Sequence, residues 1–172
     1  LELSKWARGQ TYPEIDLFET STGYSIDLDW LHDLALHTQV TYKASPVCYV
    51  HGRVLYSALA RYLRNSSQLR LSSKITILET GTARGFSALC MAKALHDFSK
   101  SGLILTFDVL PHQHRMYWNC IDDLHGTKTR AELLAPWREL IDNYVIFYQG
   151  DTRLELPRVH CPRIHFAFLD GA

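Results

Sequence analysis

Four acidic residues close, or directly follow, the short apolar runs found from residue 74 onward: Glu79, Asp108, Asp151 and Asp170. A carboxylate accepts hydrogen bonds from hydroxyl groups, attracts cations and can take up a proton. If the apolar runs are parallel strands of one sheet, their carboxyl ends meet at the edge where such sheets bind ligands. The pattern therefore predicts a ligand site lined by these four carboxylates.

The segment ETGTARG, residues 79–85, lies between an apolar run and a helical pattern. Its two glycines predict a tight turn that lets a ligand approach backbone N–H groups, so valine at either should abolish binding and leave the fold largely intact. Ala83 and Arg84 rule out the G-x-G-x-x-G dinucleotide pattern. Glu79, at the mouth of the turn, repels a pyrophosphate and favours an ammonium or sulfonium group. The alternative interpretation is an ordinary strand-to-helix turn.

Asp108 lies 23 residues after Gly85, at the end of the second apolar run. An acid at this place commonly accepts hydrogen bonds from ribose hydroxyls. A solvated aspartate at a strand end is an equally good interpretation of this residue taken alone.

Apolar runs alternate with helical patterns from residue 74 onward. Strands are predicted over 75–78, 103–108, 144–149 and 164–170. A helix is predicted over 86–98, and Thr129 with Glu132 has the form of a capping box, with a break or restart at Pro136. Strands that alternate with helices predict a Rossmann-like, doubly wound α/β sheet of parallel strands.

The N-terminal part has a different pattern. Residues 1–24 carry Gly9, Pro13 and Gly23 without a sustained period, which predicts an irregular arm. Ser25 is expected to cap a helix over 27–38. A second, amphipathic helix follows Gly52, with a polar face made of Arg53, Ser57, Arg61 and Arg64.

These patterns divide the chain at about residue 70. Residues 1–70 form an arm and helices that cap the core, and residues 71–172 form the Rossmann-like domain. The strand over 164–170 reads as a core strand, and such a strand normally has further chain to cover it. We therefore expect a longer protein, truncated here at its C-terminus.

Composition narrows the class of protein. The 172 residues are 47% hydrophobic, and 18 basic residues balance 18 acidic ones, so neither disorder nor nucleic-acid binding is indicated. No apolar run is long enough to span a membrane, and four scattered cysteines fit a reduced, cytoplasmic protein. Residues 34–78 carry six basic residues and no acid. This basic block either faces an anionic partner or, in the simpler interpretation, lies on a solvated helix face and balances the charge of the acidic residues of 1–33.

Four segments together resemble the class I S-adenosylmethionine-dependent methyltransferases. They are LETGTARGFSAL from residue 78, the run that ends in Asp108, GDT at 150–152 and HFAFLDGA at 165–172. The likeness is to the Methyltransf_24 group, whose relatives include small-molecule and sugar O-methyltransferases. It covers about residues 45–172, and its best motifs are ETGTARG and FLDGA.

The resemblance implies that one set of residues holds the methionine part of S-adenosylmethionine. This set is Glu79, Gly81, Thr82, Ala83 and Gly85, with Ser87 near the methionine carboxylate. Ala83 departs from the family pattern, since many methyltransferases have a glycine there.

The resemblance assigns the remaining acids to other parts of the site. Asp108 would bind the ribose hydroxyls, and Asp151 with Thr152 would border the adenine. Asp170 corresponds to the catalytic acid beside the transferred methyl, which in some members binds a divalent cation such as Mg²⁺.

The activity implied is methyl transfer to an oxygen of a small-molecule acceptor, with no membrane or nucleic-acid partner and with homo-oligomerisation left open. One alternative is a nicotinamide-dependent oxidoreductase, against which the absent G-x-G-x-x-G and Glu79 both count. Another is a methyltransferase-like scaffold that binds a partner through Arg53, Arg61 and Arg64.

Overall fold

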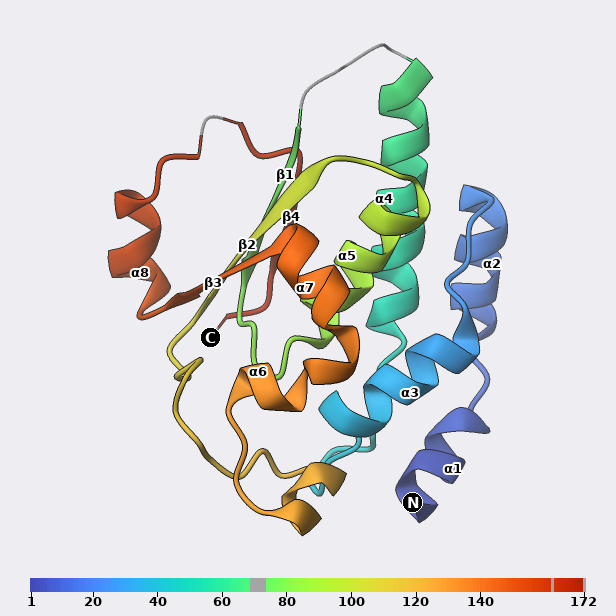
Figure 1. The fold of residues 1–172 in the computed structure, drawn as a ribbon. Helices are drawn as coiled ribbons and strands as arrows, with labels where there is room; N and C mark the ends of the chain where they lie inside the picture. The colour runs from blue at the N-terminus through green and yellow to red at the C-terminus, as the bar shows by residue number, and fades with distance from the viewer. Residues whose placement is uncertain (69–73, 162, 172) are drawn as a thin grey trace.

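The apolar runs from residue 75 onward form four parallel strands of one sheet (Figure 1). The computed structural model describes residues 1–68, 74–161 and 163–171. The strands are β1 (Ile75–Thr80), β2 (Gly102–Asp108), β3 (Val145–Gln149) and β4 (Phe166–Leu169). The sheet order β3-β2-β1-β4 places β4 on the side of β1 away from β2 and β3. The strand order therefore reverses between β1 and β4, which is where doubly wound sheets bind ligands.

Eight α-helices are described, together with three short 3₁₀ turns. They are α1 (Glu2–Arg8), α2 (Pro13–Thr22), α3 (Leu28–Thr38), α4 (His51–Gln68), α5 (Phe86–Asp97), α6 (Arg130–Leu133), α7 (Arg138–Tyr144) and α8 (Thr152–Glu155). Helices α4, α5 and α7 lie on one face of the sheet and α8 on the other, with α1 to α3 outside the first layer (Figure 1). The predicted Rossmann-like α/β class is confirmed.

Alternation along the strands builds a core on each side of the sheet. Ile77 of β1 and Ile104 of β2 belong to the larger core, which continues through α5 and α4 to the N-terminal helices. Leu78 and Phe107, from the same two strands, face the smaller core on the side of α8. Both faces of β1 and β2 are thus covered, as parallel strands require.

The expectation of an irregular arm over residues 1–24 was wrong, because α1 and α2 occupy most of it. Pro13 is at the first position of α2, where its missing N–H costs nothing. Gly23 ends α2 in the left-handed conformation with φ +81°, and Gly9 follows α1. The residues taken as breakers therefore begin and end helices.

The acidic N-terminal segment and the basic α4 pair with each other. The Arg53 guanidinium of α4 donates to the carboxylates of Glu19 and Asp16 in α2. For Arg53, the structure thus shows the simpler interpretation, in which the basic block balances the acidic N-terminal segment. Ser57, expected on the polar face, is fully buried and donates to the Arg53 carbonyl.

Several predicted boundaries shift. Asp27 rather than Ser25 caps α3, by accepting a hydrogen bond from the Trp30 N–H. Strand β1 continues through Thr80, so Glu79 belongs to the strand and not to the turn. The capping box of Thr129 and Glu132 is confirmed.

Strand β4, expected in the middle of the sheet, lies at an edge of the described sheet and pairs with β1. Its residues alternate between half-buried and exposed, and Leu169 is 69% exposed. The proposed domain boundary near residue 70 falls among residues 69–73, outside the described part of the chain, and stays a prediction. Within the described residues, no helix is long and apolar enough to cross a membrane.

Candidate functional site

A cavity of about 610 Å³ opens at the carboxyl edge of the sheet. Residues from the ends of all four strands line it: Thr80, Gly81, Ala83, Phe107, Asp108, Val109, Asp151, Thr152, Arg153, Asp170 and Gly171. The cavity lies at the reversal of strand order between β1 and β4, and its volume is in the range of small-molecule sites.

The structure brings most of the predicted site residues together. Those that line the cavity are Gly81, Ala83, Asp108, Asp151, Thr152 and Asp170. Four predicted residues lie behind the wall instead: Glu79, Thr82, Gly85 and Ser87. The roles proposed for both sets in holding a cofactor stay predictions.

Glu79 is fully buried beneath the turn, so its expected place at the mouth was wrong. Its Oε2 accepts a hydrogen bond from the Thr106 hydroxyl at 2.5 Å, and that hydroxyl also contacts Thr82. Oε1 has no hydrogen-bond partner among the described residues. Burial raises the pKa of Glu79 to about 7, although the hydroxyls of Ser87 and Thr106 partly stabilise its charge.

A side chain at either glycine of the turn would collide with another part of the protein. A Cβ at Gly81, where φ is +83°, would lie 2.7 Å from the Asp170 carbonyl oxygen. At Gly85, where φ is +90°, it would lie 2.7 Å from the Leu134 side chain. Both positions have a positive φ, which favours glycine. At Gly81 the atoms in the way belong to the backbone, so the expectation that valine leaves the fold largely intact does not hold there. At Gly85 the atom in the way is the end of a flexible side chain, and the expectation stays a prediction.

Several backbone N–H groups of the turn donate hydrogen bonds to other groups of the protein. The N–H groups of Gly81 and Thr82 donate to the Phe107 carbonyl, and that of Gly85 donates to the Thr82 carbonyl. The Ala83 N–H donates to the Asp108 carboxylate. These four N–H groups are therefore engaged within the protein and are not free to bind a phosphate.

Asp108 holds the turn to the end of β2. Its Oδ2 accepts the Ala83 N–H at 2.5 Å and its Oδ1 accepts the Leu110 N–H at 2.7 Å. Ala83 adopts φ +45°, a left-handed conformation that is strained for a residue with a Cβ. The 9% exposed carboxylate of Asp108 still has lone pairs free for a ligand hydroxyl.

Asp151 and Asp170 differ in what holds them. Asp151 caps α8 and forms an ion pair with Arg153, which lowers the pKa of Asp151 to about 2. Asp170 is exposed, and no described residue donates a hydrogen bond to its carboxylate. Its backbone is fixed, because its N–H donates to the Thr80 carbonyl at 3.0 Å. Asp170 is therefore the free carboxylate of the cavity wall.

A divalent cation at Asp170 finds no support. Across residues 1–68, 74–161 and 163–171, no three His, Cys, Asp or Glu side chains are grouped so as to hold a metal ion.

Sequence reasoning missed Arg130, whose buried side chain contacts the turn at Ala83. In the sequence it appears merely as the residue after a helix cap, and no local signal marks it as buried. Arg84, in the turn, likewise reaches away from the cavity and donates to the carbonyls of Trp118 and Thr38.

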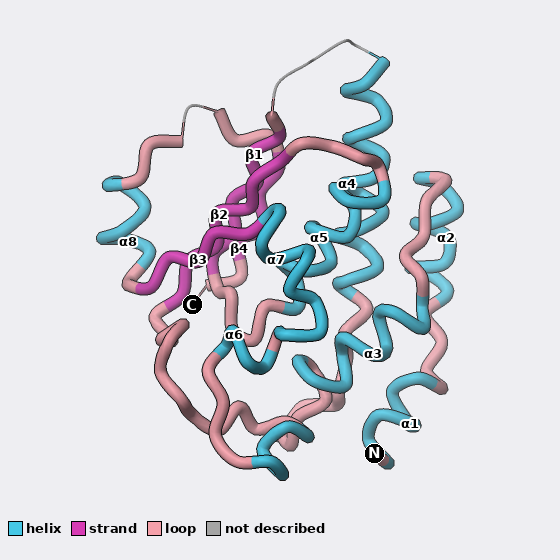
Figure 2. The backbone as a smooth tube through the Cα atoms, viewed as in Figure 1, coloured by secondary structure: helices cyan, strands magenta, loops and turns pink. Residues whose placement is uncertain are grey.

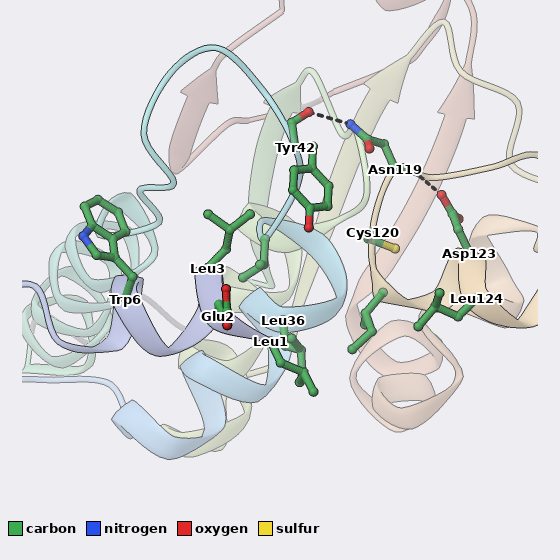
Figure 3. Close-up of a pocket in the computed structure, with 12 residues that line it drawn as sticks. Leu1, Glu2, Leu3, Trp6, Leu36, Tyr42, Asn119, Cys120, Asp123 and Leu124 are labelled. Atoms are coloured by element: carbon green, nitrogen blue, oxygen red, sulfur yellow. Dashed lines mark hydrogen bonds between the residues drawn. The ribbon is translucent and has the colours of Figure 1, made fainter.

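A larger cavity, of about 970 Å³, lies between α1, the end of α3 and the segment 119–124 (Figure 3). Leu3, Trp6 and Tyr42 form part of its mostly apolar wall, and Asn119 donates to the Tyr42 carbonyl (Figure 3). Its described lining includes none of the predicted site residues. We place the candidate site at the sheet edge, because the strand-end carboxylates converge there.

A sequence model of the Methyltransf_24 family, a methyltransferase domain, matches residues 78–172. No curated protein matches the chain.

The solved structures that are similar to this chain include the following two. The SAH-bound methyltransferase PaMTH1 from Podospora anserina has a TM-score of 0.50 and 16% identity, over 92% of this chain and 56% of that one. A candidate O-methyltransferase from Klebsiella pneumoniae has a TM-score of 0.44 and 21% identity, over 95% of this chain and 55% of that one. The chain thus spans about half the length of these structures.

At such low identity the PaMTH1 structure establishes likeness of fold, and the family match extends over more than half of the chain. The matched residues include the end of β1, the glycine turn and the strand ends that form the cavity. The chain therefore belongs to the Methyltransf_24 family of methyltransferase domains and has a class I methyltransferase fold.

Proposed function

We propose that the cavity at the sheet edge binds S-adenosylmethionine and that the protein transfers its methyl group to an oxygen of a small-molecule acceptor. The observation that carries this proposal is the convergence of six predicted residues, from the ends of all four strands, on one cavity.

The charge of the cavity favours a cationic ligand over a pyrophosphate. Its wall holds three carboxylates and one guanidinium, and Asp151 already occupies the guanidinium of Arg153. Asp170 has no ion-pair partner among the described residues, and the N–H groups of Gly81, Thr82, Ala83 and Gly85 donate within the protein. S-adenosylmethionine carries a sulfonium and an ammonium group, whereas NAD carries a pyrophosphate that this wall would repel.

Asp108 and Asp170 have different roles in this proposal. Asp108 accepts hydrogen bonds from ribose hydroxyls with the lone pairs that Ala83 and Leu110 leave free. Bound S-adenosylmethionine supplies a methyl group made electrophilic by its sulfonium sulfur. Asp170, fixed at the end of β4, accepts the proton of the acceptor hydroxyl as the new carbon–oxygen bond replaces the carbon–sulfur bond.

Binding tests the proposal directly. Calorimetry should show that S-adenosylhomocysteine binds with a micromolar or lower Kd, or about −8 kcal/mol. Asp108→Ala should weaken binding by about 1–3 kcal/mol, because the ribose loses a charged acceptor. Asp142→Ala, which removes an exposed acid of α7, is the control and should bind as the wild type does.

The same titration separates the alternatives. Tighter binding of NAD than of S-adenosylmethionine would overturn the proposal in favour of an oxidoreductase. Binding of a short RNA without any binding of S-adenosylhomocysteine would favour the scaffold interpretation. Equal affinity in wild type and Asp108→Ala would remove Asp108 from the site.

Asp170→Asn tests the catalytic step. It keeps the shape of the side chain but removes the proton acceptor, so turnover should fall roughly 10²-fold while cofactor affinity changes little. Turnover is measured as S-adenosylhomocysteine released by the protein from a panel of hydroxylated small molecules. Undiminished turnover, or a parallel loss of cofactor binding, would show that Asp170 does not take the proton.

A further inference from the structure

Arg130, the first residue of α6, buries a positive charge next to the candidate site. Its side chain is 1% exposed, and its guanidinium lies 5.7 Å from the ring of Trp118 and 5.6 Å from that of Phe147. Burial lowers the pKa of Arg130, but an arginine stays protonated in such surroundings. A buried cation is tolerated where its N–H groups have hydrogen-bond acceptors, so the acceptors of Arg130 indicate its role in the structure.

Those partners are the backbone of the turn and the end of β2. The Arg130 Nε donates to the Ala83 carbonyl at 2.9 Å, and an Nη donates to the Leu110 carbonyl at 3.4 Å. The same Nη lies 4.0 Å from the Asp108 carboxylate. One side chain thus reaches the glycine turn, the cavity carboxylate and the residue that follows β2.

Ala83 is held from both sides by these contacts. Its N–H donates to Asp108 and its carbonyl accepts from Arg130, while its φ is +45°. A residue with a Cβ keeps this conformation where its surroundings impose it. Without Arg130, relaxation of Ala83 would withdraw its N–H from Asp108 and free that carboxylate to move.

Arg130 is itself fixed by its own short helix. Thr129 and Glu132 form the capping box that begins α6, and the Arg130 N–H donates to the His112 carbonyl at 3.3 Å. The segment 109–129 leads from β2 to this helix past the carboxyl ends of the strands (Figure 2). The backbone that carries the guanidinium is therefore held in place by these hydrogen bonds.

We propose that Arg130 is a positioning residue, which sets Ala83 and Asp108 in the geometry that receives the ribose of the cofactor. This inference rests on the proposed function for the identity of the ligand. Its structural part, the hold on Ala83, does not depend on any ligand.

Arg130→Lys is the first test, because lysine keeps the charge but has one compact head in place of a planar fork. Without ligand, hydrogen exchange at the Ala83 amide should become at least about tenfold faster, while amides in the middle of β1 and α5 keep their rates. Calorimetry should show S-adenosylhomocysteine binding weakened by about tenfold or more. Unchanged exchange at Ala83 together with an unchanged Kd would overturn the inference.

Arg115→Lys is the matched control. Arg115 pairs with Glu132 of the same helix and donates to the Thr127 carbonyl, but it is exposed and does not contact the turn. We expect this variant to keep both the wild-type Kd and the wild-type exchange at Ala83. Effects as large as those of Arg130→Lys would mean that any disturbance of α6 suffices, and would contradict a specific role for Arg130.

A double-mutant comparison separates positioning from general weakening. If Arg130 acts through Asp108, Arg130→Lys in an Asp108→Ala background should change the Kd by less than about twofold. Multiplied effects would show that the two residues act independently.

A second variant keeps the inference testable if Arg130→Lys does not fold. Glycine adopts positive φ without strain, so Ala83→Gly should restore folding and most of the lost affinity to Arg130→Lys. Absence of any rescue would contradict the role given to Ala83. If the wild type itself does not bind S-adenosylhomocysteine, the proposed function fails, whereas faster exchange at Ala83 would still support the hold of Arg130 on the turn.

Discussion

Gly81→Val is expected to lower the free energy of unfolding by roughly 4 kcal/mol or more, from backbone strain and overpacking together. At φ +83° a β-branched side chain is strained, and its Cβ would lie 2.7 Å from the Asp170 carbonyl oxygen and 2.8 Å from the carbonyl carbon. These are backbone atoms at the end of β4, so relief requires the strand end to move away from β1. Urea denaturation followed by circular dichroism measures the loss.

Gly23→Val is the matched control for this change. Gly23 has φ +81°, almost the same conformation, but nothing lies within 4 Å of a Cβ built there. Its substitution should therefore report the backbone strain alone, about 1–3 kcal/mol. If the two variants lose equal stability, the contact between Gly81 and Asp170 is not what requires glycine.

The second large effect is a dependence of stability on pH caused by Glu79. Burial raises the pKa of this carboxyl from 4.5 to about 7 in the folded protein. Between these values the folded state holds a proton that the unfolded state has released, so stability falls as pH rises through this window. The contribution is fully present below pH 4.5 and lost above pH 7, and it amounts to on the order of 3 kcal/mol.

The measurement is the difference in unfolding free energy between wild type and Glu79→Gln at pH 5 and pH 8. A difference is needed because burial lowers the pKa of His32, His51 and His112, which makes stability rise with pH in part of the same range. Glutamine keeps the shape of the side chain and does not titrate, so the wild type should lose stability relative to the variant as pH rises. Glu139→Gln, at an exposed position of α7, controls for the loss of one charge. A difference that stays constant from pH 5 to pH 8 would show that Glu79 does not titrate in this window.

Local sequence patterns determined the fold class and which strand-end residues line one cavity. Apolar runs that alternate with helical patterns predicted four parallel strands, and all four are present with shifted ends. Polar residues at the strand ends predicted a ligand edge, and Asp108, Asp151 and Asp170 do line one cavity. These predictions succeed because side-chain periodicity and strand ends are local properties of a chain.

Tertiary contacts decided which groups are buried and what they touch. Helices α1 and α2 have no side-chain cap, and α2 is tied to α4 by ion pairs to Arg53, so much of their support lies far away in the sequence. Glu79 is withdrawn from the cavity because β1 extends past the point where its apolar run ends.

In the glycine turn, too, the local sequence determined one property and the tertiary structure another. The sequence by itself determined that a tight turn follows β1, since Gly81 and Gly85 permit the positive φ that the turn adopts. Only the tertiary structure decided why those glycines are needed, because Asp170 and Leu134 reach them from distant parts of the chain. The same holds for Arg130, which the sequence marks as the start of a helix and the fold turns into a buried support for Ala83 and Asp108. Burial and partners depend on segments that meet in space, and a pattern read along one segment carries no information about them.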